Sequence, residues 1–475
     1  MLPPSWFRRI AAAGFATLCL LASARAQQTE PITVPDAQLE PLRFAALDGW
    51  AADDHVASFS AFAKSCQPFR ASKDPPPPDS APLQIALWHV CQRAAALKPA
   101  TAAEARAFFE ENFRPLAIAR IGESKGLLTG YFEPVVDGSR FPSPEFHVPI
   151  YRRPPDLLVA GQPIAKAADV PNRAVINRRN GSDEIVPYYD RAAIENGALD
   201  GQGLEICWVR DPFEALSIQI QGSARIRLED GTILRINYDS HNGYPYTAVG
   251  RILIEQYGIP PDQMSMERIR QWMLANPDDA PKLRQSNASF VFFRVVGLTD
   301  QGEPLGGQGV PLSPGRSIAV DKVHLYGTPF FIMADLPIDS DKPATKFRRL
   351  MIAQDTGSAI VGPARADLYW GAGDIAGRIA GRIKQMGQFV MLLPRELDVV
   401  AAGRHTPLPR RRPPASELVS DTKTDTGDAN PPADKPSEAK VETKPSTAKS
   451  PDVTGPQSAT KRPGTCVAGG PSAAA

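Results

Sequence analysis

The chain has 475 residues, 43% of them hydrophobic, and a formal net charge of +1 from 53 basic and 52 acidic residues. This balance gives no electrostatic argument for binding a nucleic acid or an anionic membrane surface, so we expect no nucleic-acid partner. The length is sufficient for two globular domains.

The N-terminus has the parts of an export signal. Two arginines form the positive start, residues 10–22 form an apolar run, and Ala24 to Ala26 give a small-x-small cleavage site. We therefore expect residues 1–26 to be a signal peptide and the mature chain to be exported to the periplasm. An outer-membrane lipoprotein lipidated at Cys19 is the weaker alternative, because the residues before Cys19 form a poor lipid-attachment box. No later apolar run has membrane length.

Apart from Cys19, the chain has four cysteines. Cys66 and Cys91 flank a proline-rich loop between two predicted helices, and an exported chain reaches an oxidising compartment. We therefore predict a disulfide between Cys66 and Cys91, with two buried thiols as the alternative. No Cys/His cluster has metal-ligand spacing, so we expect neither a metal nor a cofactor.

Residues 43–120 have helical patterns. Residues 82–97 place apolar side chains near helical spacing, and Thr101 with Glu104 resembles a capping box before a further helix. From residue 126 onward, short β-branched or aromatic segments bounded by Gly, Pro or Asp predict strands. These segments are residues 126–136, 146–153, 205–211, 214–238, 289–296, 317–321, 330–337 and 348–355.

The order of the predicted elements favours a barrel or a pair of barrels. Asp230-Gly231 between alternating arms predicts a tight hairpin. Residues 247–258 and 265–276 predict helices, and Ser265 supplies an N-cap. The β-rich middle thus contains a helical insertion, which is not the regular alternation of a doubly wound sheet. Residues 402–475 lack aromatic side chains and predict a disordered tail.

A glycine-rich segment near the end of the folded part carries the most informative acids. It contains Asp355 and Asp367, with Tyr369 and Trp370 directly after the second. An acid beside aromatic rings, in a loop of small residues, suits cleavage of a glycosidic bond, which requires a proton donor near neutral pH. The alternatives are a surface ion pair between Arg365 and Asp367, and a turn stabilised by Asp355.

Three other segments combine polar and aromatic side chains that suit a sugar. They lie at residues 130–134, 219–223 and 238–246, and each could equally be a turn with exposed polar groups. Glu133 and Asp239 within them are reserve candidates for acid chemistry.

Two familiar patterns in this region have weaker support. Asp355-Thr356-Gly357 resembles the signature of an aspartic protease, but the other Asp-Thr-Gly, at Asp425, lies in the predicted tail, so a homodimer would be required. Glycines at 371, 373 and 377 invite a dinucleotide interpretation, but no strand–helix–strand unit surrounds them.

Several long segments in one order resemble the family of membrane-bound lytic transglycosylase A, from about residue 126 to residue 393. The segments that carry the resemblance are LLTGYFEP, QIQGSARIRLEDG, NYDSHNGYPYTAVGRILIE, MSMERIRQWM, NASFVFFR and QDTGSAIVGPARADLYWGAGDIAG. The resemblance implies a peptidoglycan lyase without a cofactor. It would cleave the β-1,4 bond between N-acetylmuramic acid and N-acetylglucosamine without water and leave a 1,6-anhydro end.

The implied fold is mainly β with helices. A double-psi β-barrel domain would comprise residues 36–138, with the N-terminal helices, and 298–401. A second, β-barrel-like domain of residues 139–297 would be inserted, with the glycan between the two. The implied partners are peptidoglycan glycan strands. A loose association with the outer membrane or with a wall-synthesis complex stays open, and the chain would act as a monomer.

The resemblance assigns roles to individual residues. Asp367 falls on the single catalytic aspartate, which acts first as acid and then as base, and Asp355 falls on an auxiliary group. The run from Gly362 to Ala366 is one residue longer than the family pattern. The remaining substrate-binding candidates are Thr129, Gly130, Tyr131, Gln221, Ser223, Asn242, Tyr369 and Trp370.

Three other functions stay open at this stage. The first is a non-catalytic polysaccharide-binding protein built on a double-psi barrel. The second is the homodimeric aspartic protease. The third is an ordinary muramidase, which would add water and leave reducing ends.

Overall fold

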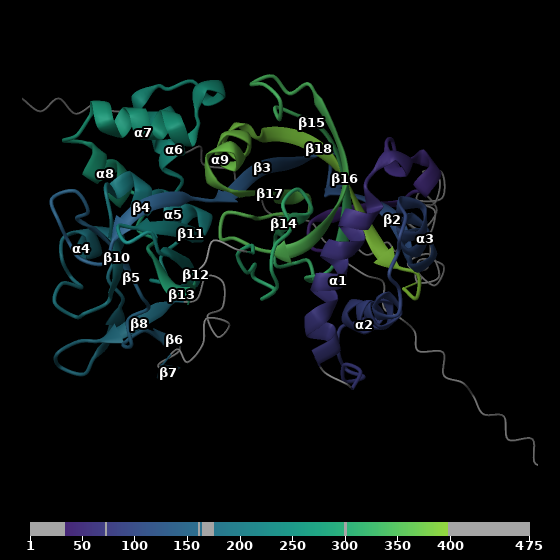
Figure 1. Ribbon diagram of the computed structural model, residues 1–475, viewed down its shortest axis with the longest axis horizontal. Helices are drawn as coiled ribbons and strands as arrows, with labels where there is room; N and C mark the ends of the chain where they lie inside the picture. The colour runs from purple at the N-terminus through teal and green to yellow at the C-terminus, as the bar shows by residue number, and fades with distance from the viewer. Residues whose placement is uncertain (1–33, 72–73, 160–161, 164–174, 299–301, 398–475) are drawn as a thin grey trace, which may run out of the picture. The chain divides into compact units, whose positions relative to one another are not determined.

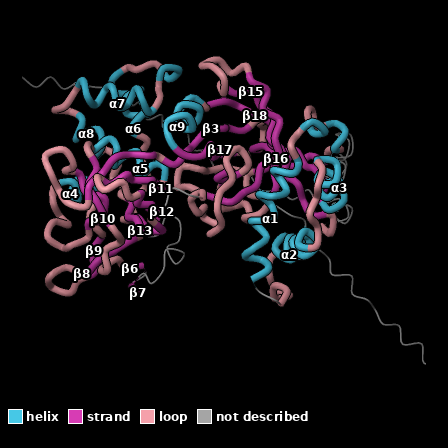
Figure 2. The backbone as a smooth tube through the Cα atoms, in the orientation of Figure 1, coloured by secondary structure: helices cyan, strands magenta, loops and turns pink. Residues whose placement is uncertain are grey.

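The protein is described here by a computed structural model, shown in Figure 1, in which the strands outnumber the helices (Figure 2). The structure describes residues 34–71, 74–159, 162–163, 175–298 and 302–397. The predicted signal peptide and the predicted tail lie outside these described residues. Within them, no helix combines the length and the apolar character needed to cross a membrane.

Six strands close into a barrel. Around the ring their order is β3, β17, β14, β16, β15 and β18, and the pairing of β18 with β3 completes the circle. The pairs β3–β17 and β14–β16 are parallel, and the other four are antiparallel. The strands are β3 (Gly126–Glu133), β14 (Ser317–Val320), β15 (Pro329–Leu336), β16 (Thr345–Asp355), β17 (Arg365–Ala372) and β18 (Lys384–Pro394).

Alternate residues of these strands fill a common apolar core. Leu128, Ile318, Met351 and Leu368 are fully buried in it. Since strand side chains alternate between faces, the residues between them point the other way. Strand β18 pairs with β3 in its first half and with β2 (Phe113–Arg120) in its second, and β1 (Ala37–Pro41) pairs with β2.

Three N-terminal helices pack on the outer face of β15, β16 and β18, with Phe62 and Phe109 in one cluster with Phe331. The helices are α1 (His55–Ala71), α2 (Pro82–Ala95) and α3 (Ala102–Asn112). The cap of α3 is the one that the sequence predicts, since Glu104 N donates to Thr101 Oγ1 at 3.2 Å. Cys66 and Cys91 form a disulfide between α1 and α2, with their Cα atoms 5.2 Å apart.

The inserted part of the chain, from β4 to β13 (residues 135–297), contains a six-stranded sheet in the order β13, β12, β11, β4, β10 and β5. The predicted hairpin at Asp230-Gly231 joins β11 to β12. A single bridge between Arg152 and Phe293 links the two edges, so the sheet curls toward closure. The strands are β4 (Val135–Ser139), β5 (Val148–Tyr151), β10 (Glu205–Val209), β11 (Ser223–Leu228), β12 (Ile233–His241) and β13 (Val291–Gly297).

Further elements of the inserted part surround this sheet. The predicted helix at residues 265–276 is present, and Arg268 N donates to Ser265 Oγ at its start. The helices are α4 (Arg191–Glu195), α6 (Val249–Tyr257), α7 (Met266–Ala275) and α8 (Ala280–Gln285), and a small sheet comprises β6 (Leu158–Val159), β7 (Gln162–Pro163), β8 (Ile176–Arg179) and β9 (Ile185–Pro187).

The prediction of one long strand segment at residues 214–238 is wrong in its first third, which is helix α5 (Pro212–Gln221). Asp211 caps this helix by accepting from Phe213 N at 2.8 Å. Gly222, with φ of 80°, ends it in the left-handed conformation. Because apolar and polar residues alternate from Leu216 onward, the strand pattern competes with these cap signals in the sequence.

Candidate active site

Asp367 lies in the middle of β17, between β3 and β14, where it stands opposite Thr129 and Ala319. The expectation of a glycine-rich loop is therefore wrong at this position. The neighbours Ala366 and Leu368 point into the barrel core, so Asp367 points away from it and is half-buried. A regular strand fixes such a side chain more firmly than a loop would.

Thr129 and Arg365 hold the Asp367 carboxyl group. Thr129 Oγ1 donates to Asp367 Oδ1 at 2.6 Å, and Arg365 Nη2 donates to the same Thr129 Oγ1 at 2.8 Å. Because arginine can only donate, the threonine proton must point toward Asp367. Burial raises the pKa of Asp367, while the Arg365 charge and the Thr129 hydrogen bond act in the opposite direction.

Asp355 ends β16 and is a second carboxyl group in the same region. Its Oδ1 accepts from Gly307 N at 2.7 Å and from Thr356 N at 2.9 Å, and its Oδ2 accepts from Tyr131 Oη at 2.9 Å. Burial and, to a smaller extent, the charge of Asp367 raise the pKa of Asp355 to about 6, against the effect of these hydrogen bonds. The two carboxyl groups therefore interact electrostatically.

Tyr131 and Tyr369 pack together between these acids and the inserted part, with ring centroids 5.2 Å apart. Tyr369 is fully buried, and its hydroxyl donates to Glu303 Oε2 at 2.6 Å. Burial and the nearby carboxylates raise the pKa values of both tyrosines, so both hydroxyls stay protonated donors.

Trp370 does not share this face. On strand β17 it alternates with Asp367 and Tyr369, and its ring packs at the edge of the barrel core near Phe347, with ring centroids 6.2 Å apart. The structure thus contradicts the prediction that both aromatic residues lie beside the acid, because neighbouring strand residues face opposite sides.

Gly130 and Gln221 lie where β3 contacts the helices α9 and α5. A Cβ atom at Gly130 would lie 2.7 Å from Ala380 Cα, so the glycine allows helix α9 (Gly373–Arg382) to pack closely on β3. Gln221, the last residue of α5, accepts from Phe132 N at 3.0 Å through its Oε1. This bond links the inserted part to the strand that carries Thr129. Ser223, two residues later, is buried in β11.

Asn242 holds a loop of the inserted part and is itself fully buried. Its Nδ2 donates to the carbonyl groups of Tyr189 and Ala288, and its Oδ1 accepts from Phe290 N. Both N–H donors of the amide are used within the protein and the side chain is fully buried, so the prediction that Asn242 lines a substrate groove is not supported by its geometry.

Sequence reasoning missed Tyr246, on the same loop as Asn242. Burial raises the pKa of Tyr246, and the charge of Asp367 adds to this effect, so the loop comes within electrostatic range of the acid. The signal in the sequence was the polar and aromatic composition of residues 238–246.

The two reserve acids are committed to ion pairs. Glu133 is fully buried and its Oε2 lies 2.6 Å from Arg225 Nε. Asp239 Oδ2 lies 2.8 Å from Arg153 Nε. These ion pairs give neither Glu133 nor Asp239 support as the acid.

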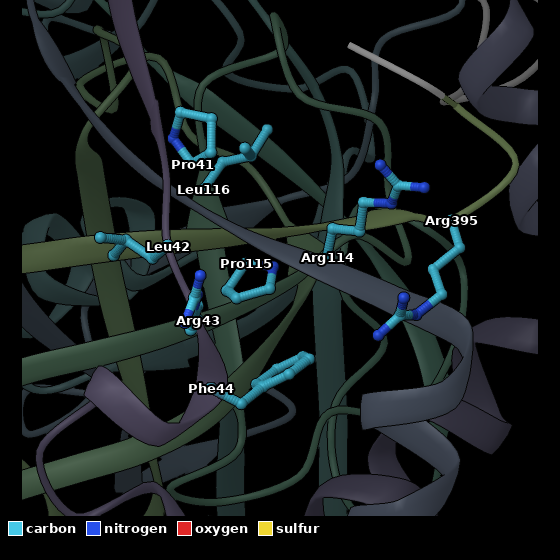
Figure 3. Close-up of a pocket in the computed structure, with 8 residues that line it drawn as sticks. All are labelled: Pro41, Leu42, Arg43, Phe44, Arg114, Pro115, Leu116 and Arg395. Carbon is cyan, nitrogen blue, oxygen red and sulfur yellow. The ribbon is translucent and has the colours of Figure 1, made fainter. Parts of the chain in front are cut away.

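A cavity of ≈ 380 Å³ lies elsewhere, against β1 and β2. Arg43, Arg114 and Arg395 line it together with Phe44 and prolines (Figure 3). None of the predicted site residues reaches it. In the part of the chain that the structure describes, no group of three His, Cys, Asp or Glu residues could hold a metal ion.

The fold and the site together define a class of protein. It is a mainly β protein in which one strand of a closed barrel carries a half-buried acid with a raised pKa, beside an inserted, curled sheet. The family models agree in detail, since the MltA-specific insert domain matches residues 127–294 and the 3D domain matches residues 316–393. The chain belongs to the membrane-bound lytic murein transglycosylase A family.

Solved structures and a curated relative give the same result. The membrane-bound lytic murein transglycosylase of Agrobacterium tumefaciens is 35% identical, with 77% of this chain and 99% of that chain covered and a TM-score of 0.67. MltA of Neisseria gonorrhoeae is 30% identical, with 77% and 95% covered and a TM-score of 0.62. Membrane-bound lytic murein transglycosylase A of Vibrio cholerae is 32% identical over 275 residues. That match covers 56% of this chain and 66% of the relative's length.

Proposed function

We propose that this chain is a lytic transglycosylase. It cleaves the β-1,4 bond between N-acetylmuramic acid and N-acetylglucosamine in peptidoglycan and forms a 1,6-anhydromuramic end, so it is a carbon–oxygen lyase. The observation that carries the proposal is Asp367, a half-buried carboxyl group whose pKa is raised and whose geometry Thr129 fixes. Relatives that carry the name of this activity add support, since they match most of the described part of the chain.

In the proposed reaction Asp367 donates its proton to the glycosidic oxygen as the bond from that oxygen to C1 of the muramic residue breaks. The leaving sugar thereby gains a hydroxyl group. The muramic O6 then bonds to C1, and its proton passes to the ionised Asp367, which restores the acid. One carboxyl group is enough because the nucleophile belongs to the substrate, unlike in the two-carboxylate hydrolases. Holding O6 near C1 supplies the entropic advantage.

The hydrogen bonds around Asp367 suit this role. Thr129 occupies Oδ1, and among the described residues no donor reaches Oδ2, which is therefore free to carry the proton. Arg365 keeps Thr129 oriented as a donor. Its charge also limits the rise in the pKa of Asp367, so the carboxyl group can return to its ionised form after donating the proton.

Several finer features belong to the same proposal. The two parallel pairs in the ring support a barrel of the double-psi type, built from residues 36–138 and 298–401 around an insertion at 139–297. Since β4 already pairs with β11 of the inserted sheet, we place the point where the chain leaves the barrel and enters the insertion nearer Pro134 than residue 139. We further propose a signal peptide at residues 1–26, export to the periplasm, and action as a monomer on glycan strands.

The protease alternative receives no support from Asp355. Both of its carboxylate oxygens accept hydrogen bonds from Tyr131, Gly307 and Thr356 of the same chain. An aspartic protease dyad requires two such carboxylates to share a proton across a symmetric interface.

Mass spectrometry of the products from purified peptidoglycan tests the proposal. We expect 1,6-anhydromuramic ends, which are one water lighter than the products of hydrolysis. Reducing ends would instead identify a muramidase, and binding without release would identify a non-catalytic glycan-binding protein.

A further inference from the structure

A chain of polar contacts begins where the polypeptide leaves the barrel. Glu133, the last residue of β3, has a fully buried carboxylate. Its Oε2 accepts from Arg225 Nε at 2.6 Å, and its Oε1 accepts from Arg235 Nη2 at 3.1 Å. These arginines lie on β11 and β12 of the inserted sheet. A charge removed from water is costly unless it is well paired, so these contacts fix the inserted sheet at the crossing point.

Arg225 also contacts the segment at Gly302 and Glu303, where the chain returns from the inserted part to the barrel. Arg225 Nη2 donates to the carbonyl of Gly302 at 3.0 Å and lies 3.8 Å from Glu303 Oε2. This Oε2 atom accepts the hydroxyl of Tyr369 at 2.6 Å. Tyr369 lies two residues after Asp367 on the same face of β17. The contacts therefore run from the inserted sheet to the strand that carries Asp367.

We propose that Tyr369, Glu303 and Arg225 form a positioning relay that fixes the inserted sheet relative to Asp367. The inference rests on the function proposed above. Tyr369 is then a positioning residue rather than a substrate-binding one, because its ring is fully buried and its hydroxyl is committed to Glu303. A glycan that contacts both parts of the chain must meet the acid in the right place, and a displacement of about 1 Å can cost about a hundredfold in rate.

Tyr369→Phe tests the relay, since it removes one hydroxyl and keeps the packed ring. We expect kcat on purified peptidoglycan to fall about tenfold or more, because the acid is misplaced in the transition state. Binding of purified glycan strands, measured in the inactive Asp367→Asn background, should change by no more than about twofold, because the glycan contacts themselves remain.

Glu303→Gln provides a second variant at a partly exposed site. It keeps an acceptor for the Tyr369 hydroxyl but loses the charge that faces Arg225, so its kcat should lie between those of the wild type and Tyr369→Phe. If the two residues act through one another, the double variant should be no slower than Tyr369→Phe alone.

Asp137→Asn is the matched control. Asp137, on β4, also pairs with two arginines, at 2.7 Å from Arg210 and 2.8 Å from Arg227, but these pairs stay within the inserted part. Its loss should leave kcat unchanged.

The outcomes separate the inference from the function on which it rests. An active wild type with an equally fast Tyr369→Phe overturns the relay and leaves the function intact. A parallel loss of kcat, glycan binding and melting temperature also overturns the relay, because that result would show a general loss of stability rather than a misplaced acid. A wild type that releases no anhydro product overturns the proposed function itself.

Discussion

Asp367 is balanced between opposing effects on its pKa. Burial favours the protonated form, which the acid step needs, and the neighbouring Arg365 favours the ionised form, which the base step needs. Either effect alone would fix one state, because a paired surface carboxylate stays ionised and an isolated buried one stays neutral. Both together allow one side chain to serve as acid and base in turn.

Asp355→Asn should change stability in a pH-dependent way. The pKa of Asp355 rises from 3.8 to about 6 on folding. A raised pKa contributes stability that is present below about pH 4 and is lost as the pH rises through about 6. The neutral asparagine avoids this loss, so at pH 7.5 the variant should be more stable than the wild type by about 1–3 kcal/mol, and the gain should vanish near pH 4.

Urea unfolding at the two pH values measures this difference. Asp137→Asn is a control of opposite sign, since the hydrogen bond from Arg210 lowers the pKa of Asp137. A gain for Asp355→Asn that is equal at pH 4 and pH 7.5 would show that the charge is not its cause. Because Asp355 is not the proposed acid, this variant should keep part of its activity.

At the scale of secondary-structure elements, the sequence predicts what local signals encode. The cap at Thr101, the hairpin at Asp230 and the pairing of Cys66 with Cys91 each depend on residues close together in the chain. Helix α5 shows the limit, because an alternating pattern concealed a helix whose capping residues, Asp211 and Gly222, were present.

The candidate site depends on pairings that local signals do not contain. Thr129 meets Asp367 across 238 residues of chain, and only the family resemblance suggested that they act together. The position of Trp370 could not be predicted while its segment was taken for a loop, since the alternation of faces follows from β17 being a strand.

The disulfide between α1 and α2 should stabilise the fold without affecting the chemistry. Its cysteines are 25 residues apart, and closing a loop of this size in the unfolded chain contributes about 2–4 kcal/mol. The double variant Cys66→Ser/Cys91→Ser should lose this stability in urea unfolding but keep its kcat at low temperature. Reductant should lower the stability of the wild type and leave that of the variant unchanged, and equal sensitivity of the two proteins would contradict the assignment.

At the scale of the whole molecule, the folded chain crosses between barrel and inserted sheet, and side-chain contacts reinforce the crossing. Gln221 provides one of them through its bond to Phe132 N. Gln221 is also one of the predicted substrate-binding residues, so Gln221→Ala should weaken glycan binding about fivefold to tenfold. The free energy of unfolding should fall by no more than about 1.5 kcal/mol, the contribution of one hydrogen bond.

Gln221→Glu is the matched variant, because it keeps an oxygen that can accept from Phe132 N. It should restore the stability that Gln221→Ala loses. A loss of stability in Gln221→Ala well above that of one hydrogen bond would indicate a purely structural residue.

The most direct test of the account compares the wild type with Asp367→Asn on the same purified peptidoglycan. The account predicts 1,6-anhydromuramic ends from the wild type, a rate lower by about a hundredfold to ten-thousandfold in the variant, unchanged glycan binding, and a melting temperature no lower than that of the wild type. Near-native release of anhydro products by Asp367→Asn would contradict it.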